Sequence, residues 1–320
     1  IKMNIIKLIC INLLCINGLV VFSQQIKYQP LISKSDLVER EIVQDLVVGK
    51  TPSSHLVTPT GAFTYNVPIR IPTGTSGMEP KVALVYSSQS GNGIAGYGWN
   101  IAGLSSISRV NQSHFHDGKS KGVLHTYSTN NPFAIDGNRL IAESGKYGQG
   151  GTIYKTESES FSKITQVAVS GTESWFKVET KQGIIMEYGR TADSRIVANQ
   201  NVTAIYNEIV YKLNRTIDRF GNYIDYEYET LHDEHVIKRI SYTGNINIEQ
   251  KPYAYINFYY QKRADNNRIY TTERGRKFDL NNLLESIDIT YGEGNESFKR
   301  YELKYGFNFY SYLNEIVEYG

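Results

Sequence analysis

The chain is poor in cysteine and in net charge. Its 320 residues contain two cysteines, Cys10 and Cys15, both near the N-terminus. For the rest of the chain this excludes a disulfide framework, a thiolate nucleophile and a cysteine-ligated metal. The formal charge of +2 falls to about zero once Lys2 and Lys7 are left out, which is too little positive charge to grip a nucleic-acid backbone. We therefore expect no nucleic-acid partner and no cofactor, and a fold that depends on packing alone.

Long hydrophobic runs are also scarce. One apolar stretch stands out, from Leu8 to Phe22, and it is shorter than the roughly 20 residues that span a bilayer. Lys7 precedes this stretch, and Val21 and Ser23 stand at the −3 and −1 positions before Gln24. A basic start, an apolar middle and small or aliphatic residues at the end are typical of a signal peptide.

Composition divides the chain into three parts. We expect a signal peptide at residues 1–23, an irregular N-terminal arm at 24–57 and one β domain at 58–320. Within the arm, residues 36–48 repeat apolar positions every four residues and are expected to be helical. The chain should be secreted or displayed on the cell surface, without stable membrane insertion after the signal is removed. Lipidation at Cys15 remains an alternative.

What the chain has in abundance is aromatic residues, with 25 Tyr and 12 Phe. After residue 58 the apolar positions alternate with a period of two, as in Phe63, Tyr65, Val67 and Ile69. Turns rich in Gly and Asn separate these runs, at residues 72–77, 91–98, 136–138, 148–151, 221–222, 244–245 and 292–295. The pattern predicts an all-β fold, in which antiparallel hairpins form the curved sheets of a β-shell that is incomplete without downstream chain.

The most informative stretch is residues 61–109, which reads GAFTYNVPIRIPTGTSGMEPKVALVYSSQSGNGIAGYGWNIAGLSSISR. It predicts a strand that ends in prolines, a loop rich in Gly and Thr, a second strand and a glycine corner beside Trp99. Residues 67–109 resemble the opening of the SpvB-type N-terminal domain, which is named for the Salmonella plasmid virulence protein. The same domain begins the B components of insecticidal toxin complexes.

The resemblance continues more weakly downstream. The run IDRFGN at residues 217–222, followed by Tyr226 and Tyr228, resembles the family's Asp-x-x-Gly-Asn hairpin, which is close to the YD repeat of RHS shells. Arg263 and Asp265 fit the "R-x-D" part of a later family run, and Leu284 fits its "L-x-x-I" part. We therefore extend the resemblance over most of residues 58–320.

The resemblance implies a scaffold rather than an enzyme. It implies a non-catalytic shell module of a secreted toxin-complex or RHS-type polymorphic toxin protein, one that helps enclose or present a downstream payload. The implied partners are downstream RHS or propeller portions of the same polypeptide, or other toxin-complex components. Because relatives continue well beyond this point, we expect the domain to be truncated at its C-terminal end. The residues expected to have structural roles are Pro68, Pro72, Gly77, Tyr86, Gly91, Asn92, Gly93, Gly96, Gly98, Trp99, Gly221 and Asn222.

Two other function classes stay open. The many Tyr and Asn residues are compatible with a surface adhesin or a glycan-binding β protein. A hydrolase with paired carboxylates is also conceivable, because Asp225, Glu227 and Glu229 alternate along one strand and would share a face. A solvated strand face is the more ordinary explanation of these carboxylates.

Several short motifs suggest ligand sites, and each has a simpler structural reading. Residues 91–96 satisfy G-x-G-x-x-G, but glycines downstream interrupt any following helix, so a turn is favoured over a dinucleotide site. His114 and His116 would share one strand face, with His125 as a third ligand, yet a surface strand end is favoured over a metal site. Residues 232–235 read His-Asp-Glu-His and are favoured as a polar loop between strands.

An ADP-ribosyltransferase motif can also be traced along the chain. Arg109, the run Ser-Thr-Asn at residues 128–130 and the run Glu-Ser-Glu at residues 157–159 follow in the order that such enzymes use. The middle run is broken at Asn130, and Arg109 belongs to a strand that the SpvB-type pattern already explains. We therefore favour a chance match.

The signal peptide makes the first testable prediction. When the gene is expressed with its own leader, we expect cleavage after Ser23, so that the exported protein begins at Gln24. Mass spectrometry of the N-terminal peptide measures this start. An exported protein that retains residues 8–22 would contradict the assignment.

Overall fold

A computed structural model describes most of the chain after its first fifty residues. The chain divides into two units, residues 1–50 and Thr51–Gly320, and the second is described below by itself. The signal peptide and the helix expected at 36–48 lie outside the described residues. The described residues are 51–123, 131–169, 173–197, 208–265, 269–271 and 277–320.

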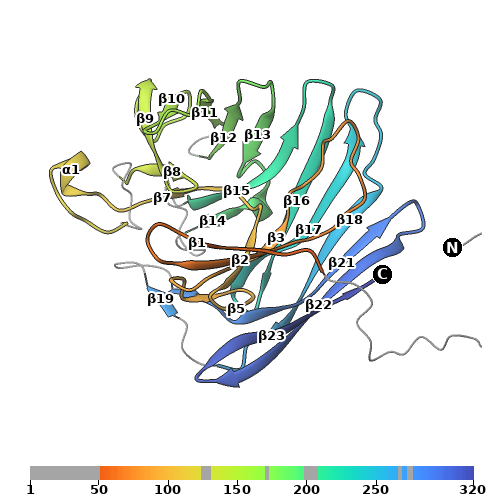
Figure 1. The fold of residues 1–320 in the computed structure, drawn as a ribbon. Helices are drawn as coiled ribbons and strands as arrows, with labels where there is room; N and C mark the ends of the chain where they lie inside the picture. The colour runs from red at the N-terminus through yellow and green to blue at the C-terminus, as the bar shows by residue number, and fades with distance from the viewer. Residues whose placement is uncertain (1–50, 124–130, 170–172, 198–207, 266–268, 272–276) are drawn as a thin grey trace, which may run out of the picture. The chain divides into compact units, whose positions relative to one another are not determined.

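Nearly all the regular structure in this unit is β-strand (Figure 1). The described helical elements are one turn of α-helix, α1 (His114–Asp117), and one 3₁₀ turn, Ala192–Ser194. No helix within these ranges is long and apolar enough to cross a membrane. Three short strands lie outside the main groupings given below: β14 (Arg195–Val197), β19 (Ile269–Thr271) and β20 (Lys277–Asp279).

The first part of the unit forms a four-stranded antiparallel sheet in the order β1-β2-β3-β6. A two-stranded hairpin, β4-β5, connects β3 to β6 along the chain. The bounds are β1 (Ser54–Val57), β2 (Phe63–Pro68), β3 (Ala83–Ser87), β4 (Asn92–Gly93), β5 (Gly96–Tyr97) and β6 (Trp99–Ala102). The strands expected around residues 63–69 and 82–86 are therefore present. β1 lies within the stretch that was expected to be an irregular arm. Its residues form a strand because they pair with β2 along the whole length of β1.

Eight strands of the second part form a closed, barrel-like sheet. Their pairings run in sequence from β7 to β13, and β15 then pairs with both β13 and β7. Closure removes the free edges that an open sheet would expose. The bounds are β7 (Ser106–Arg109), β8 (Phe133–Ile135), β9 (Asn138–Ser144), β10 (Ile153–Thr156), β11 (Lys163–Ala168), β12 (Ser174–Glu179), β13 (Ile185–Tyr188) and β15 (Glu208–Ile217).

β15 is the strand at which the barrel joins an open sheet. Ile217 near its end is paired on one edge with Ile185 of β13 and on the other with Tyr223 of β16. From there the sheet continues in the order β16-β17-β18-β21-β22-β23 (Figure 1). The bounds are β16 (Asn222–Leu231), β17 (Glu234–Asn245), β18 (Ala254–Lys262), β21 (Asn282–Tyr291), β22 (Glu296–Asn308) and β23 (Tyr310–Tyr319). The sequence-based prediction of antiparallel hairpins in curved sheets is confirmed.

Aromatic side chains fill the barrel. An eight-stranded barrel is just wide enough for side chains to occupy its interior. Phe133 and Phe176 lie at the centre, with ring centroids 5.0 Å apart, and Tyr211 meets Phe176 edge-on at 4.9 Å. Tyr154 completes the cluster through edge contacts with Tyr147 and Phe133. Edge-to-face pairs add to the free energy gained from burying ring area alone.

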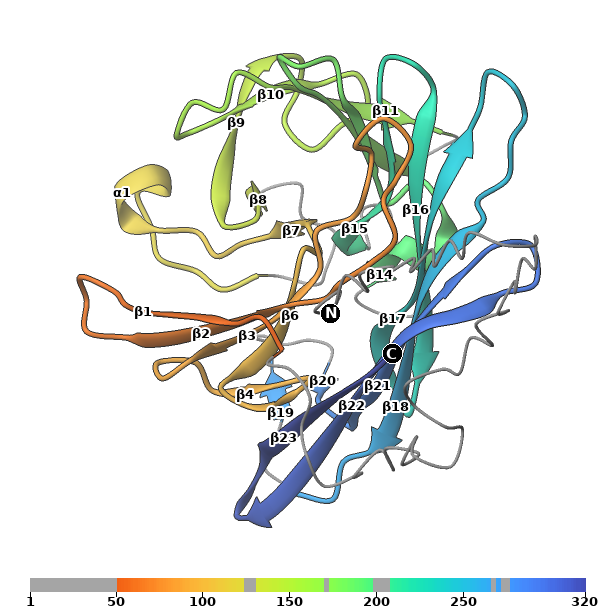
Figure 2. The ribbon, with the colours of Figure 1, turned by 45° about the vertical axis from the view of Figure 1, so that its right-hand side comes forward.

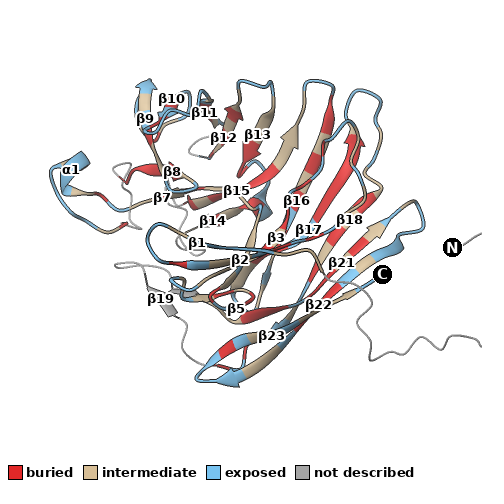
Figure 3. Cartoon of the chain, viewed as in Figure 1, coloured by how far each residue is buried: buried red, intermediate tan, exposed pale blue. Residues whose placement is uncertain are grey.

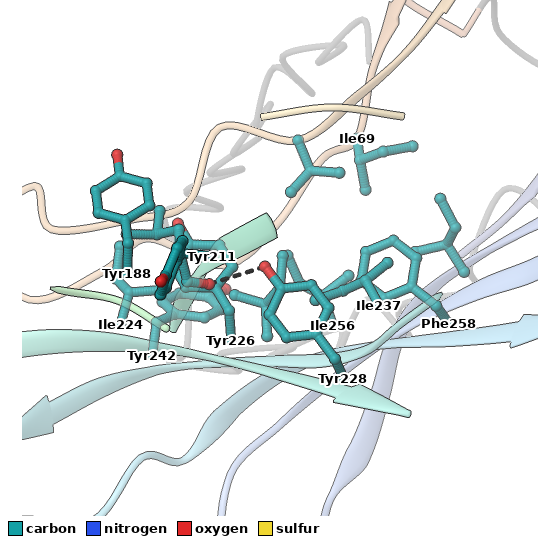
Figure 4. Close-up of a cluster of buried hydrophobic side chains, with 14 of the residues drawn as sticks. Ile69, Tyr188, Tyr211, Ile224, Tyr226, Tyr228, Ile237, Tyr242, Ile256 and Phe258 are labelled. Atoms are coloured by element: carbon teal, nitrogen blue, oxygen red, sulfur yellow. Dashed lines mark hydrogen bonds between the residues drawn. The ribbon is translucent and has the colours of Figure 1, made fainter. Parts of the chain in front are cut away.

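One continuous core joins the barrel, the open sheet and the four-stranded sheet. Figure 3 shows the burial as bands along the middle of the strands, with exposed residues in the loops that connect them. In the close-up of Figure 4, the side chains of Tyr226, Tyr228 and Ile256 rise from the open sheet, and Ile69 from the chain after β2 lies on the other side of the cluster. The alternating tyrosines of β16 therefore serve as core residues.

The ring cluster of the barrel makes a testable prediction. Replacing Phe176 by Ala should lower the free energy of unfolding by about 3–5 kcal/mol, because the cavity left among the packed rings cannot collapse. Urea denaturation followed by circular dichroism measures the loss. Phe115→Ala is the matched control, since Phe115 is 89% exposed and its removal should change stability by less than about 0.5 kcal/mol. Equal effects of the two substitutions would contradict the packing argument.

Candidate functional site

The glycine corner singled out in the sequence is a tight hairpin. β4 and β5 pair through Asn92 with Tyr97 and through Gly93 with Gly96, and the Gly98 amide donates to the Gly91 carbonyl at 2.8 Å. The chain then runs directly into β6. Because a strand and not a helix follows, the G-x-G-x-x-G run has no helix N-terminus at which a pyrophosphate could bind. The interpretation of this run as a turn is confirmed.

Two of its glycines have space for no other residue. A Cβ atom on Gly93 would lie 2.1 Å from the Trp99 carbonyl oxygen. A Cβ on Gly98 would lie 2.4 Å from the ring of Tyr86, and its φ of +80° also favours glycine. The Tyr86 and Trp99 rings are neighbours, with centroids 5.5 Å apart. The corner therefore closes against these two aromatic residues.

A buried arginine connects the corner to the open sheet. The side chain of Arg263, which follows β18, is fully buried, and one of its Nη atoms donates to the Gly93 carbonyl. Its Nε donates to the Asn282 carbonyl at 3.3 Å, and its other Nη lies 3.6 Å from a carboxylate oxygen of Asp265, whose side chain is also fully buried. A buried charge is costly unless it is paired and hydrogen-bonded, and here it meets both conditions.

Asp265 extends this junction to the last hairpin of the unit. Its second carboxylate oxygen accepts a 2.8 Å bond from the Ser311 amide on β23. β21 joins the corner directly, since the Leu284 amide donates to the Ile94 carbonyl at 2.8 Å. The two stretches that carried the resemblance, residues 91–99 and the run containing Arg263, therefore meet in space. We name this set of contacts between the corner, Arg263, Asp265 and β21–β23 the corner junction.

Tyrosine hydroxyls fix the chain between β2 and β3. Tyr242 donates to the Pro72 carbonyl at 2.9 Å, and the Tyr301 hydroxyl accepts from the Arg70 amide at 3.1 Å. Burial raises the pKa of Tyr242, so its hydroxyl keeps the proton that it donates. Pro68 is the last residue of β2, and Gly77 lies in the turn that the Thr75–Met78 bridge closes.

The Asp-x-x-Gly-Asn run forms the expected hairpin between β15 and β16. Asp218 accepts bonds from the amides of Phe220 and Asn222 at 2.8 and 2.9 Å, which closes the turn. The buried side chain of Asn222 in turn accepts a 2.8 Å bond from Asn245, at the end of β17. The Gly221 carbonyl accepts from the Ile246 amide. The motif therefore ties the β15–β16 turn to the β17–β18 turn.

The His-Asp-Glu-His run is a second polar junction; His232 and Asp233 form the turn between β16 and β17, and Glu234 and His235 already belong to β17. His232 is hydrogen-bonded to the Asn282 side chain at 2.7 Å. A single carboxylate oxygen of Glu234 accepts from the amides of Asn281 and Asn282, both at 2.8 Å. Burial raises the pKa of Glu234, and these hydrogen bonds oppose that rise. His235 reaches the Asp193 carbonyl at 2.6 Å, so the two histidines do not converge on one point.

The prediction that His114 and His116 lie on a strand was wrong. They lie in the helical turn α1 and not on a strand, because the Ser113 side chain caps the first turn and Gly118 ends it in a left-handed conformation. His116 contacts Glu157 at 2.7 Å, and Asp117 pairs with Arg139 at 2.6 Å. His125 lies outside the described residues.

The other catalytic motifs do not assemble in the parts that the structure describes. Arg109 is buried with its guanidinium 4.4 Å from the Phe133 ring centroid, and its Nε donates to the Glu208 carbonyl. The Ser-Thr-Asn run at 128–130 lies outside these parts. Asp225 forms a two-point ion pair with Arg215, at 2.5 and 2.7 Å, so it does not pair with a second carboxylate. Among the described residues no group of three or more His, Cys, Asp or Glu could hold a metal ion.

The comparisons with known proteins agree with this geometry. The family model described as "Salmonella virulence plasmid 65kDa B protein" (SpvB) matches residues 57–303. No curated protein matches the chain. A solved structure of the N-terminal domain of effector protein SpvB from Salmonella typhimurium strain LT2 is similar, with 16% identity and a TM-score of 0.60 over 79% of this chain and 98% of that one.

Two toxin structures show the same fold. The crystal structure of TcdB2-TccC3 matches with 17% identity and a TM-score of 0.64, over 84% of this chain and 16% of that one. The Photorhabdus luminescens Tc holotoxin pore matches with 17% identity and a TM-score of 0.64, over 84% of this chain and 15% of that one. The chain therefore spans about a sixth of the length of these toxin chains.

The corner junction makes a testable prediction. Arg263→Met should lower the free energy of unfolding by about 3–5 kcal/mol, because Asp265 would stay buried without its cation. The double variant Arg263→Met/Asp265→Leu should lose less than the single one, since the stranded charge is then gone. Urea denaturation measures both.

The control for this cycle is an exposed ion pair. Lys177 and Glu179 are 2.8 Å apart and about a third exposed, so Lys177→Met should cost at most about 1 kcal/mol. A double variant that is less stable than Arg263→Met would contradict this expectation.

Proposed function

The chain belongs to the SpvB family, whose model covers residues 57–303, and from this premise we propose that it is a scaffold module of a secreted toxin-complex or RHS-type polymorphic toxin protein. In this role it has no catalytic activity of its own. It forms part of a β wall that helps enclose or present a payload carried elsewhere in the same assembly.

The observation that carries this proposal is that the buried charged groups bind other parts of the domain. Arg263 and Asp265 are fully buried and join the glycine corner to the last hairpin. Glu234 is held by the amides of Asn281 and Asn282. An enzyme needs charged groups that face its substrate. In the parts of the chain that the structure describes, the junctions instead direct their charged groups at neighbouring strands.

The lengths of the similar structures also support a module. The fold accounts for 98% of the solved SpvB N-terminal domain but for 16% of the TcdB2-TccC3 chain. The same fold thus serves as a separate domain in one protein and as one portion of a much longer chain in another. We infer that its partners here are further portions of the same polypeptide, of the RHS or propeller kind, or other toxin-complex components.

We propose structural roles for the motif residues within this wall. Gly91, Asn92, Gly93, Gly96 and Gly98 shape the corner, which Tyr86 and Trp99 pack, and Gly221 and Asn222 tie the β15–β16 turn to the β17–β18 turn. Pro68, Pro72 and Gly77 direct the chain between β2 and β3. For the whole chain we propose a signal peptide at 1–23, an N-terminal arm at 24–57 and the wall domain at 58–320, with export to the cell surface or the medium.

Limited proteolysis of the intact gene product tests the proposal. Any portion encoded beyond Gly320 should be protected from protease while the wall is sound, and Gly93→Ala should raise its cleavage rate at least about tenfold. The reason is that a Cβ atom on Gly93 would collide with the Trp99 carbonyl oxygen. The matched control is Gly294→Ala, since a Cβ atom there meets nothing closer than 3.9 Å. Mass spectrometry of the fragments gives the rates.

Three outcomes would contradict a scaffold role. One is a stop codon directly after Gly320 in the natural gene. A second is equal cleavage of the downstream portion in both glycine variants. The third is a purified protein that turns over a small molecule and loses that turnover when one acidic or imidazole side chain is changed.

A further inference from the structure

A cavity of about 270 Å³ opens between the four-stranded sheet and β23. Figure 2 shows these two elements, with β1 and β2 on one side and the long β22–β23 hairpin below them. The cavity is lined by Tyr65, Val67, Trp99, Leu313, Glu315 and Ile316, among others. A cavity of this size takes a small ligand or one head group of a larger one.

The aromatic lining comes from one rung of the four-stranded sheet. His55, Tyr65, Tyr86 and Trp99 are directly opposite one another on β1, β2, β3 and β6. Their side chains therefore share one face of the sheet. Tyr65 and Trp99 both line the cavity, with ring centroids 6.1 Å apart and ring planes at 73°. Two aromatic walls near a right angle resemble a cage for an organic cation.

These rings are held in place before any ligand arrives. The Tyr65 hydroxyl donates to Ser53 at 2.6 Å, and Trp99 packs against Tyr86 at 5.5 Å. On the opposite side, the register of β22 against β23 shifts so that Asn314 is an extra residue between Leu313 and Glu315. Bulges of this kind re-aim side chains next to binding sites. A preorganised site loses less conformational entropy on binding.

One carboxylate, that of Glu315, lines the cavity, and a bound cation could take the place of its present ion-pair partner. Glu315 lies 3.1 Å from the Nζ of Lys304, and both side chains are more than half exposed. Exposed ion pairs of this kind contribute little to stability. A cation bound against the rings would therefore replace Lys304 at Glu315 at small cost. Val67 and Ile316 add apolar lining, which suits a methylated ammonium better than a strongly hydrated primary amine.

We propose that this cavity binds an organic ammonium ion, with a quaternary trimethylammonium group in the angle that the Tyr65 and Trp99 rings form and its charge next to Glu315. The trimethylammonium group belongs either to a free small molecule or to the head group of a choline lipid. The site shares Trp99 with the glycine corner but does not depend on the scaffold role, because it uses no downstream chain.

Fluorescence of Trp99 provides the measurement. The chain has two tryptophans, and Trp175→Phe leaves Trp99 as the sole emitter. In this background we expect choline to change the emission saturably, while its uncharged carbon isostere dimethylbutanol binds at least about fivefold more weakly. Saturation-transfer NMR from aromatic protons to the choline methyl groups reports binding even if the emission stays constant. Vesicles of phosphatidylcholine, compared with vesicles of phosphatidylglycerol, show whether the lipid head group is the source.

Substitutions on the two sides of the ion pair should act in opposite directions. Glu315→Gln should weaken choline binding roughly threefold, and Lys304→Gln should strengthen it by a similar factor, because the ligand no longer competes with the lysine. Neither change should alter binding of dimethylbutanol. Tyr65→Leu should weaken choline binding about fivefold, whereas Tyr65→Phe, which keeps the ring, should stay within about twofold.

Clear results would overturn the proposal. Equal binding of choline and dimethylbutanol would show an apolar cavity without cation selectivity. A response to glucose but not to choline would make the cavity a saccharide site. Absence of binding by both fluorescence and NMR, in a chain whose circular dichroism shows folded β structure, would remove the site altogether.

Discussion

The contact between the Arg263 guanidinium and the Gly93 carbonyl connects parts of the chain that are 170 residues apart. The arginine is fully buried and needs Asp265 beside it, and Asp265 in turn accepts from the Ser311 amide. One ion pair therefore fixes the glycine corner, the end of β18 and the β22–β23 hairpin at a single point. Without the pair, a buried charge would have no counterion and the corner would lose its anchor on the open sheet.

The barrel and the open sheet divide the structural work differently. The barrel closes on itself through β15, and its interior is packed by aromatic rings such as Phe133, Phe176 and Tyr211. The open sheet has no such closure and is held to the chain between β2 and β3 through contacts such as Tyr242 with Pro72 and Tyr301 with Arg70. Tyrosine suits these positions because its ring is buried in the core while its hydroxyl satisfies a backbone group.

The proposed ammonium site uses what the core does not cover. Val67 packs in the core and also lines the cavity, and Tyr65, two residues away on the same face of β2, lines the cavity and packs against the core. Tyr65 and Trp99 therefore contact both the core and the cavity. A wall domain can hold such a site without compromising its packing, because the rings are fixed by Ser53 and Tyr86 and not by the ligand.

The sequence by itself determined the local features of this protein. The strands, the corner at Gly91–Gly98 and the hairpin at Gly221 and Asn222 were predicted correctly, because a turn depends on a few consecutive residues and a strand on its own alternation. The helical turn at His114 and His116 was missed, since a single turn has no periodicity to detect. Arg263 and Asp265 fitted a family pattern, but their burial against Gly93 was not foreseen. Only the tertiary structure decided that contact, the closure of the barrel at β15 and the cavity beside Trp99, because each depends on how far the sheets twist before distant segments meet.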